Sequence, residues 1–197
     1  MGRFMPSQYE KERSFLDITY LKHGNKRQKK VYVLLEKLCI MDRLQKYNPI
    51  LVGTIPIEID IESSDIDILC EVYELGKFSD YLQREFGKYP RFFVWEKERD
   101  ARKYVVAKFY YDGFDFEIYG QDIPTIQQYG YRHMVIEDRI LKRMDSAFRN
   151  NVIQFKKQGL KTEHAFAKLL DLRGDAYQAL LELELLSDEK LISSLLK

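Results

Sequence analysis

The sequence predicts an α+β protein in which helices pack against a mixed β-sheet and the C-terminal third is helical. Three observations lead to this fold class. Residues 25–40 carry apolar side chains at helical spacing, and residues 49–121 contain several runs rich in β-branched and aromatic residues. Residues 124–197 return to helical spacing. We therefore expect an α+β core over residues 1–123 and a helical region over residues 124–197 packed on it.

The first part of the core is predicted to be helical. Asn25 is placed to cap a helix whose apolar residues recur at i, i+3, i+4 and i+7, namely Val31, Leu34, Leu35 and Leu38. The basic side chains near its start are expected on its solvated face: Lys26, Arg27, Lys29 and Lys30. A shorter helical segment should end at Asn48-Pro49.

Strands are expected over residues 49–53, 64–72, 91–98 and 103–111, with a helix over residues 77–89. Asp112-Gly113 lies between two alternating runs, which predicts a tight hairpin and a fifth strand. Beyond Pro124, we expect packed helices interrupted at Gly159 and Gly174, the first with Met134, Ile136, Ile140, Leu141 and Met144 on one broad face.

Composition excludes several classes of protein. The chain has 197 residues, 45% of them apolar, with 32 basic and 31 acidic side chains and a net charge of +1. This balance disfavours strong non-specific binding to nucleic acid. Two cysteines without C-x-x-C spacing exclude a zinc finger and a disulfide framework. No apolar run is long enough to cross a membrane, and residues 1–14 lack the apolar core of a signal peptide, so we expect a soluble, cytoplasmic protein without a membrane partner.

Two pairs of carboxylates indicate the chemistry. Asp65 and Asp67 share one face of a predicted strand, and Asp115 and Glu117 share one face of another. If the strands are neighbours, three or four of these carboxylates converge on one patch. Two unit charges about 5 Å apart at an effective dielectric of about 20 repel by roughly 3 kcal/mol. A hard cation, Mg²⁺ or Mn²⁺, would relieve this repulsion. The alternative for D-x-D alone is a solvated strand face.

The residues upstream favour the metal. Gly53-Thr54 closes the first predicted strand, and Ser64 stands directly before Asp65. This order resembles the polymerase-beta-like nucleotidyltransferase superfamily, whose signature is a strand, Gly-Ser or Gly-Thr, Asp-x-Asp on the next strand, and one further carboxylate on a later strand. The resemblance implies a phosphate turn at Gly53 and Thr54, with Ser64 beside it.

A closer resemblance covers Tyr20 to Leu181. The segments YLKHGNKRQ, NPILVGTIPIEIDIESSDIDI, FEIYGQ, YRHM and KTEHAFAKLL are similar to the bacterial family catalogued as domain of unknown function 4269. The resemblance implies the nucleotidyltransferase-like fold and a metal site at Asp65, Asp67 and a third carboxylate. Glu117 is the better match for the third position, with Asp115 as its rival.

The sequence therefore suggests metal-dependent transfer of a nucleotidyl group from a nucleoside triphosphate to a hydroxyl acceptor, with Asp65, Asp67 and Glu117 as catalytic residues. The alternative is a catalytically inactive binding module of the same fold. Acidic residues in the segment after the turn, Glu58, Asp60 and Glu62, would repel a triphosphate.

One further set of basic residues is a candidate for phosphate binding. Arg132, Arg139 and Arg143 fall on one helical stripe, and Arg132 is the candidate for nucleotide binding. A solvated helix face is the alternative for all three. His133 is expected to be a structural hydrogen-bonding residue.

Overall fold

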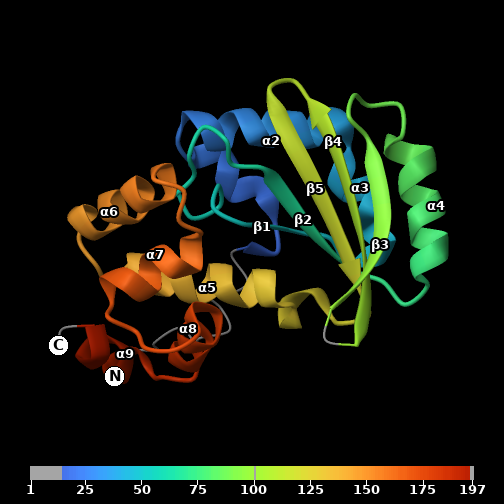
Figure 1. The fold of residues 1–197 in the computed structure, drawn as a ribbon. Helices are drawn as coiled ribbons and strands as arrows, with labels where there is room; N and C mark the ends of the chain where they lie inside the picture. The colour runs from blue at the N-terminus through green and yellow to red at the C-terminus, as the bar shows by residue number, and fades with distance from the viewer. Residues whose placement is uncertain (1–14, 100, 196–197) are drawn as a thin grey trace, which may run out of the picture.

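The computed structural model describes residues 15–99 and 101–195. Residues 1–14, which the sequence predicts to lack the apolar core of a signal peptide, lie outside these ranges. The chain forms a five-stranded mixed sheet and a group of helices, which confirms the α+β class (Figure 1).

The strands are β1 (Ile50–Val52), β2 (Ile66–Glu71), β3 (Phe93–Arg99), β4 (Arg102–Tyr111) and β5 (Phe114–Gln121). The α-helices are α2 (Lys26–Leu38), α3 (Ile40–Leu44), α4 (Leu75–Phe86), α5 (Tyr129–Leu141), α6 (Ser146–Lys157), α7 (Thr162–Leu169), α8 (Ala176–Glu184) and α9 (Asp188–Leu195). Short 3₁₀ turns cover Ile18–His23, Gln45–Tyr47 and Thr125–Gln127.

The order of strands in the sheet is β1-β2-β5-β4-β3. β2 and β5 run parallel, and all other neighbours are antiparallel. The predicted hairpin joins β4 to β5, and both of its turn residues, Asp112 and Gly113, have positive φ. A two-residue turn of this kind fixes the register, so Tyr111 faces Phe114.

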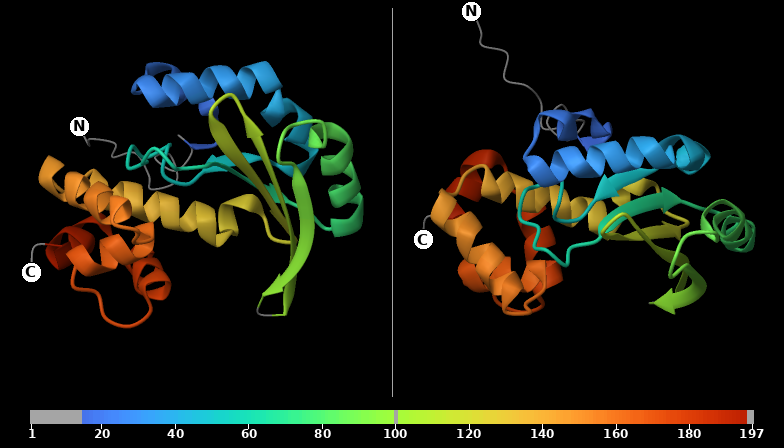
Figure 2. Two further views of the ribbon diagram at one scale, coloured as in Figure 1. Left: turned by 45° about the horizontal axis from the view of Figure 1, so that its top comes forward. Right: turned by 90° about the horizontal axis from the view of Figure 1, so that it is seen from above.

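One face of the sheet is covered by α2, α3 and α4 (Figure 2). Alternate residues of β2 and β5, such as Ile66, Ile68 and Phe116, point into this layer and are fully buried. Asn25 caps α2, as predicted, and forms a reciprocal pair of hydrogen bonds with Gln28. The apolar stripe of α2 is therefore fixed against the sheet.

The other face carries the C-terminal helices, which gather at the β1 side of the sheet (Figure 2). α5 packs on Ile50, Val52 and Leu69, and it is buried on nearly all sides rather than on one broad face. It begins at Tyr129 and not at Pro124, because Gln128 is extended and its side-chain amide donates to the carbonyls of Cys70 and Ile123. The rest of this sheet face, over β5 and β4, is left open to a cleft.

In residues 15–99 and 101–195, no helix combines the length and the apolar character needed to cross a bilayer.

Candidate functional site

The parallel pairing of β2 with β5 brings two of the predicted acids together. Asp67 is the register partner of Glu117, and Glu117 is in turn the partner of Lys108 on β4. Val52 on β1 faces Asp67. Because side chains at paired positions point to the same face, one row of the sheet reads Val52, Asp67, Glu117, Lys108.

Lys108 places a cation inside the acidic cluster. Its Nζ lies 2.6 Å from Oε2 of Glu117 and 3.6 Å from Oδ2 of Asp65. All three side chains are partly shielded from solvent, with exposures of 42% for Lys108, 29% for Glu117 and 35% for Asp65. The ammonium therefore offsets part of the repulsion that the sequence predicted for this group.

Asp67 occupies the most confined position of the cluster. Burial, followed by the charges of Glu117 and Asp65, raises its pKa to about 7, although Lys108 and Lys156 act in the opposite direction. Its carboxylate also lies directly above Gly53. Asp67 is thus a desolvated acid whose charged form needs a nearby cation.

Asp65 precedes β2 instead of lying within it. The strand begins at Ile66 because the carbonyl of Ser64 accepts a hydrogen bond from the Arg27 side chain, 3.1 Å away, rather than from a neighbouring strand. Asp115 lies beyond the residues paired with β2, is 56% exposed, and contacts Arg91 at 3.6 Å.

In the described part of the chain, no three acidic, histidine or cysteine side chains are arranged to hold a metal ion as they stand. Three of the three or four acids expected to converge do lie close together: Asp67 and Glu117 are neighbours, and Lys108 contacts both Glu117 and Asp65. The fourth, Asp115, turns to Arg91. The donors are all carboxylate oxygens, which suits a hard divalent cation, and an ammonium already occupies a position among them.

The glycine of the predicted phosphate turn has a clear steric role. Gly53 has φ +85°, and a Cβ built on it would lie inside van der Waals contact with Oδ2 of Asp67. Only glycine allows both the backbone conformation and the approach of the carboxylate. Thr54 and Ser64 join the two ends of the following segment, since their hydroxyl oxygens are 3.2 Å apart and Ser64 Oγ accepts from the Ile61 amide.

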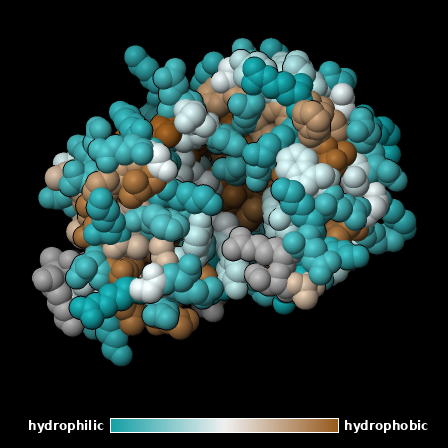
Figure 3. All heavy atoms as spheres, viewed as in Figure 1, coloured by the Kyte–Doolittle hydropathy of each residue, from teal (hydrophilic) through white to brown (hydrophobic). Residues whose placement is uncertain are grey.

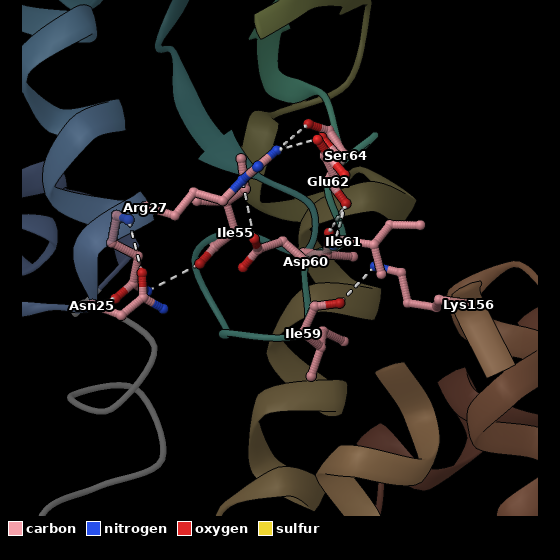
Figure 4. Close-up of polar contacts among 11 residues, drawn as sticks. Asn25, Arg27, Ile55, Ile59, Asp60, Ile61, Glu62, Ser64 and Lys156 are labelled. Atoms are coloured by element: carbon pink, nitrogen blue, oxygen red, sulfur yellow. Dashed lines mark hydrogen bonds and ion pairs between the residues drawn. The ribbon is translucent and has the colours of Figure 1, made fainter. Parts of the chain in front are cut away.

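The segment between Thr54 and Ser64 is held by cations from two helices (Figure 4). Arg27 of α2 contacts Asp60 at 3.0 Å and also donates to the carbonyls of Glu62 and Ser64. From the other side, Lys156 of α6 donates to the carbonyl of Ile59 over 2.7 Å. The expectation that Arg27 lies on a solvated face is therefore wrong, whereas Lys26, Lys29 and Lys30 are exposed.

A cleft of about 1270 Å³ lies over the open face of the sheet, between the sheet and the C-terminal helices. The space-filling view shows a hollow in this region (Figure 3). Asp67, Glu117, Gly53 and Thr54 line its sheet side. The acids of the 54–64 segment do not line it, and Asp60 is already paired with Arg27. The acidic side chains of that segment, which the sequence predicts to repel a triphosphate, therefore do not face a ligand in the cleft.

The helical side of the cleft is also acidic. Its lining includes Glu137, Glu163, Asp175 and Glu184. Arg132 lines the cleft as well, but both its Nε and one terminal nitrogen donate to Oε2 of Glu184, at 2.9 and 2.7 Å. The one arginine proposed for nucleotide binding is therefore already paired with a carboxylate.

The other residues of that arginine stripe hold the fold together. Arg139 and Arg143 both contact Asp188, and Arg139 also donates to the carbonyls of Glu184 and Leu186. Both alternatives considered for these two, phosphate binding and a solvated face, are wrong. His133 has its Nε2 3.0 Å from the Tyr177 carbonyl and is 6% exposed, which agrees with a structural role.

Sequence reasoning missed Lys108, which contacts the acidic cluster, and Glu137, which lines the cleft. Lys108 could have been found from the hairpin, since a two-residue turn at Asp112-Gly113 places it opposite Glu117. The sequence gives only a weak indication that Glu137 belongs to a site, namely one carboxylate within the apolar pattern of α5. The structure shows it 4% exposed in the cleft wall.

Solved structures with a similar fold are nucleotidyltransferases. One is Cid1, described as an RNA terminal uridylyl transferase, with a TM-score of 0.51, 13% identity, and coverage of 87% of this chain and 54% of that one. Another is the Cid1 poly(U) polymerase with MgGTP bound, with a TM-score of 0.51, 13% identity, and coverage of 90% and 55%. The chain thus spans about half the length of these proteins, and the likeness establishes the fold.

No curated protein matches the sequence. The sequence model of one family, described as "Domain of unknown function (DUF4269)", matches residues 33–183, which is most of the chain and includes every residue of the cleft's sheet side. The fold is the one that these nucleotidyltransferase structures share, as the resemblance implied. The chain belongs to the DUF4269 family.

Proposed function

We propose that the protein transfers a nucleotidyl group from a nucleoside triphosphate to a hydroxyl acceptor, using a divalent cation held by Asp65, Asp67 and Glu117. The observation that carries this proposal is the register of β2 and β5, which sets Asp67 beside Glu117 at the base of a large cleft. The Cid1 structure with MgGTP bound shares the fold, which supports nucleotidyl transfer as the class of reaction.

The residues fit a cation for two physical reasons. All the donors are carboxylate oxygens, the ligands that Mg²⁺ and Mn²⁺ prefer. In addition, the cluster already accepts the Lys108 ammonium at 2.6 Å from Glu117. A divalent cation would replace this ammonium as the neutralising charge, with Lys108 moving aside toward solvent.

Each part of the cleft then has a task. The backbone at Gly53 and Thr54 lies beside Asp67 and is open to a phosphate group. A bound cation would neutralise charge on the phosphates and lower the pKa of the acceptor hydroxyl. The acceptor oxygen bonds to the α-phosphorus, the bond from that phosphorus to the β-phosphate oxygen breaks, pyrophosphate leaves, and a carboxylate of the cluster takes the hydroxyl proton.

The alternative is a catalytically inactive module of the same fold, and Lys108 is the observation that favours it. An ammonium held between Glu117 and Asp65 neutralises the cluster without any metal. In that case the cleft would bind a ligand but transfer nothing.

Calorimetric titration of Mn²⁺ and Mg²⁺, alone and with each nucleoside triphosphate, tests the proposal. We expect Mn²⁺ to bind and to raise the melting temperature by mass action. Asp67→Asn should abolish both effects while leaving the metal-free protein at least as stable, because a buried charge is removed. Glu117→Gln should weaken Mn²⁺ binding at least tenfold, about 1.4 kcal/mol.

Asp115→Asn is the matched control, since Asp115 lies on the same strand and face as Glu117 but contacts Arg91. Its Mn²⁺ affinity should equal that of the wild type. Equal losses in both variants would contradict the assignment of Glu117, and a full metal response in Asp67→Asn would refute the site. Metal binding without any NTP-dependent product would favour the inactive module.

A further inference from the structure

The helical wall of the cleft has a charge pattern that the proposed nucleotidyl transfer does not use. Three elements contribute carboxylates to it: Glu137 from α5, Glu163 from α7, and Asp175 and Glu184 from the start and the end of α8. Arg132 is the one guanidinium among the described lining residues of this wall, and Glu184 already pairs with it. Asp175 accepts from the Gln178 amide as the cap of α8.

Glu137 provides independent information that this wall is built for a ligand. Its side chain is 4% exposed, it lies in the lining of the cleft, and its Oε1 has no hydrogen-bond partner in the described part of the chain. A buried acceptor without a donor destabilises the folded protein. This unpaired oxygen lies in the cleft wall, where a hydrogen-bond donor of a bound ligand could pair with it.

The electrostatic surroundings of Glu137 identify the kind of donor. Burial, and then the charge of Glu163, raise the pKa of Glu137 well above its usual value, while Lys156 opposes this. The Lys156 ammonium is directed to the carbonyl of Ile59 and does not contact the carboxyl. A second cation beside Glu137 and Glu163 would therefore stabilise their charged forms, whereas an anion would be repelled.

We propose that the wall formed by Glu137 and Glu163 binds a protonated amine, and that the acceptor of this protein is a cationic hydroxyl compound such as an amino sugar. The role as acceptor rests on the proposed function, whereas the amine site itself does not. A ribonucleic acid acceptor is disfavoured, because a polyanion needs a track of free cations, and the described lining of the cleft contains two arginines, the exposed Arg102 of β4 and Arg132, which Glu184 already pairs. The remaining volume of the cleft, about 1270 Å³ in total, admits a nucleotide together with a compound of several rings.

The test uses two trisaccharides with the same β-1,4-linked backbone: the trimer of glucosamine, which carries protonated amines, and its N-acetylated counterpart, which carries neutral acetamides at the same positions. A uridine trinucleotide is the anionic probe. Each is titrated by calorimetry into the full chain, without metal or triphosphate. We expect the glucosamine trimer to bind at least tenfold more tightly than the acetylated trimer, with little or no binding of the trinucleotide.

Variants then locate the site. Glu137→Gln keeps the shape of the side chain and should weaken binding of the glucosamine trimer at least tenfold, and Glu163→Gln should weaken it by a smaller factor. Glu182→Gln is the matched control, an exposed glutamate on α8 outside the cleft lining. Melting curves verify that each variant folds. If Glu137→Gln does not fold, Glu163→Gln decides alone.

Two outcomes overturn the inference: equal affinity for the two trisaccharides, or unchanged affinity for the glucosamine trimer in the folded glutamine variants. Tighter binding of the trinucleotide would replace it with a nucleic-acid acceptor. Because these titrations contain no metal or nucleotide, their result is independent of the Mn²⁺ titrations that test nucleotidyl transfer. Failure of one proposal can therefore be told from failure of the other.

Discussion

The two walls of the cleft manage buried negative charge in different ways. On the sheet side, Glu117 and Asp65 share the ammonium of Lys108, which approaches Glu117 to 2.6 Å. On the helical side, Glu137 keeps an oxygen without a partner and has a raised pKa. The protein itself compensates the charge of the first wall, whereas on the second wall burial and the charge of Glu163 disfavour the ionised form of Glu137.

This difference indicates what each wall can receive. A ligand at the sheet wall must displace the Lys108 ammonium. Only a strongly charged group such as a divalent cation gains enough electrostatic free energy from the carboxylates to do so. A ligand at the helical wall has only to stabilise the ionised form of Glu137 and to offer its Oε1 a hydrogen-bond donor. The two walls also differ in their backbone. On the sheet wall, position 53 must be glycine because its φ is positive and the Asp67 carboxylate lies against it. On the helical wall, Gly130 of α5 has an ordinary φ that other residues can adopt.

Gly53→Ala should have the largest effect of the changes that test this comparison. Its positive φ costs about 1–2 kcal/mol for an L-residue, and the contact with the Asp67 carboxylate adds strain of similar size, so we expect a loss of about 3 kcal/mol in the free energy of unfolding. Chemical denaturation measures this loss.

Two companion variants separate its causes. In an Asp67→Ala background, Gly53→Ala should cost only the backbone part, because the carboxylate is gone. On the opposite wall, Gly130→Ala should be nearly neutral, since the added methyl group gains helix propensity and contacts only the Leu69 side chain, at 3.3 Å. An equal cost with and without Asp67 would show that the carboxylate does not confine Gly53.

Much of the sheet wall could be predicted from the sequence. Alternation placed Asp65, Asp67, Asp115 and Glu117 on particular strand faces, and the hairpin at Asp112-Gly113 fixed the β4–β5 register. The same register contains Lys108 opposite Glu117. What alternation could not give was the parallel pairing of β2 with β5, because no turn connects them and their register depends on tertiary packing.

The helical wall was less predictable for a different reason. Helical periodicity reports which face of a segment is apolar, but it does not report which distant helix covers that face. Arg139 looked like part of a polar stripe, yet it is 9% exposed because α9 and the end of α8 close over it. Glu137 is also buried, with Glu163 of α7 and Lys156 of α6 close enough to act on its pKa. Charges on a central helix therefore needed the structure for their interpretation.

Lys108→Gln should have an intermediate effect, and its sign should depend on metal. Without a cation, the carboxylates lose their compensating charge and the melting temperature should fall. With Mn²⁺, the competing ammonium is absent, and the affinity should rise about fivefold, which is about 1 kcal/mol. Lys103→Gln, an exposed lysine of the same strand, is the control and should change neither quantity. An unchanged or lower Mn²⁺ affinity would mean that Lys108 does not compete for the site.

Glu137→Gln should have the smallest effect on stability and a characteristic dependence on pH. The pKa of Glu137 in the folded protein is raised above its unfolded value near 4.5, so both states are protonated at pH 4 and the variant should then match the wild type. As pH rises above about 4.5, the unfolded wild type gains stability by ionising while the folded carboxyl stays neutral, and the wild type loses stability relative to the variant until the folded pKa is passed. Melting curves at pH 4 and pH 7.5 should show a gain for the variant at the higher pH only, of about 3–5 °C for each pKa unit by which the folded value exceeds the unfolded one. Glu163 and Lys156 act on this carboxyl in the folded wild type, and the Glu137 charge in turn raises the Lys156 pKa, so both measurements are made below the Lys156 pKa of about 8. Glu182→Gln should show no such gain, and a difference that is the same at both pH values would mean that Glu137 ionises normally within the fold.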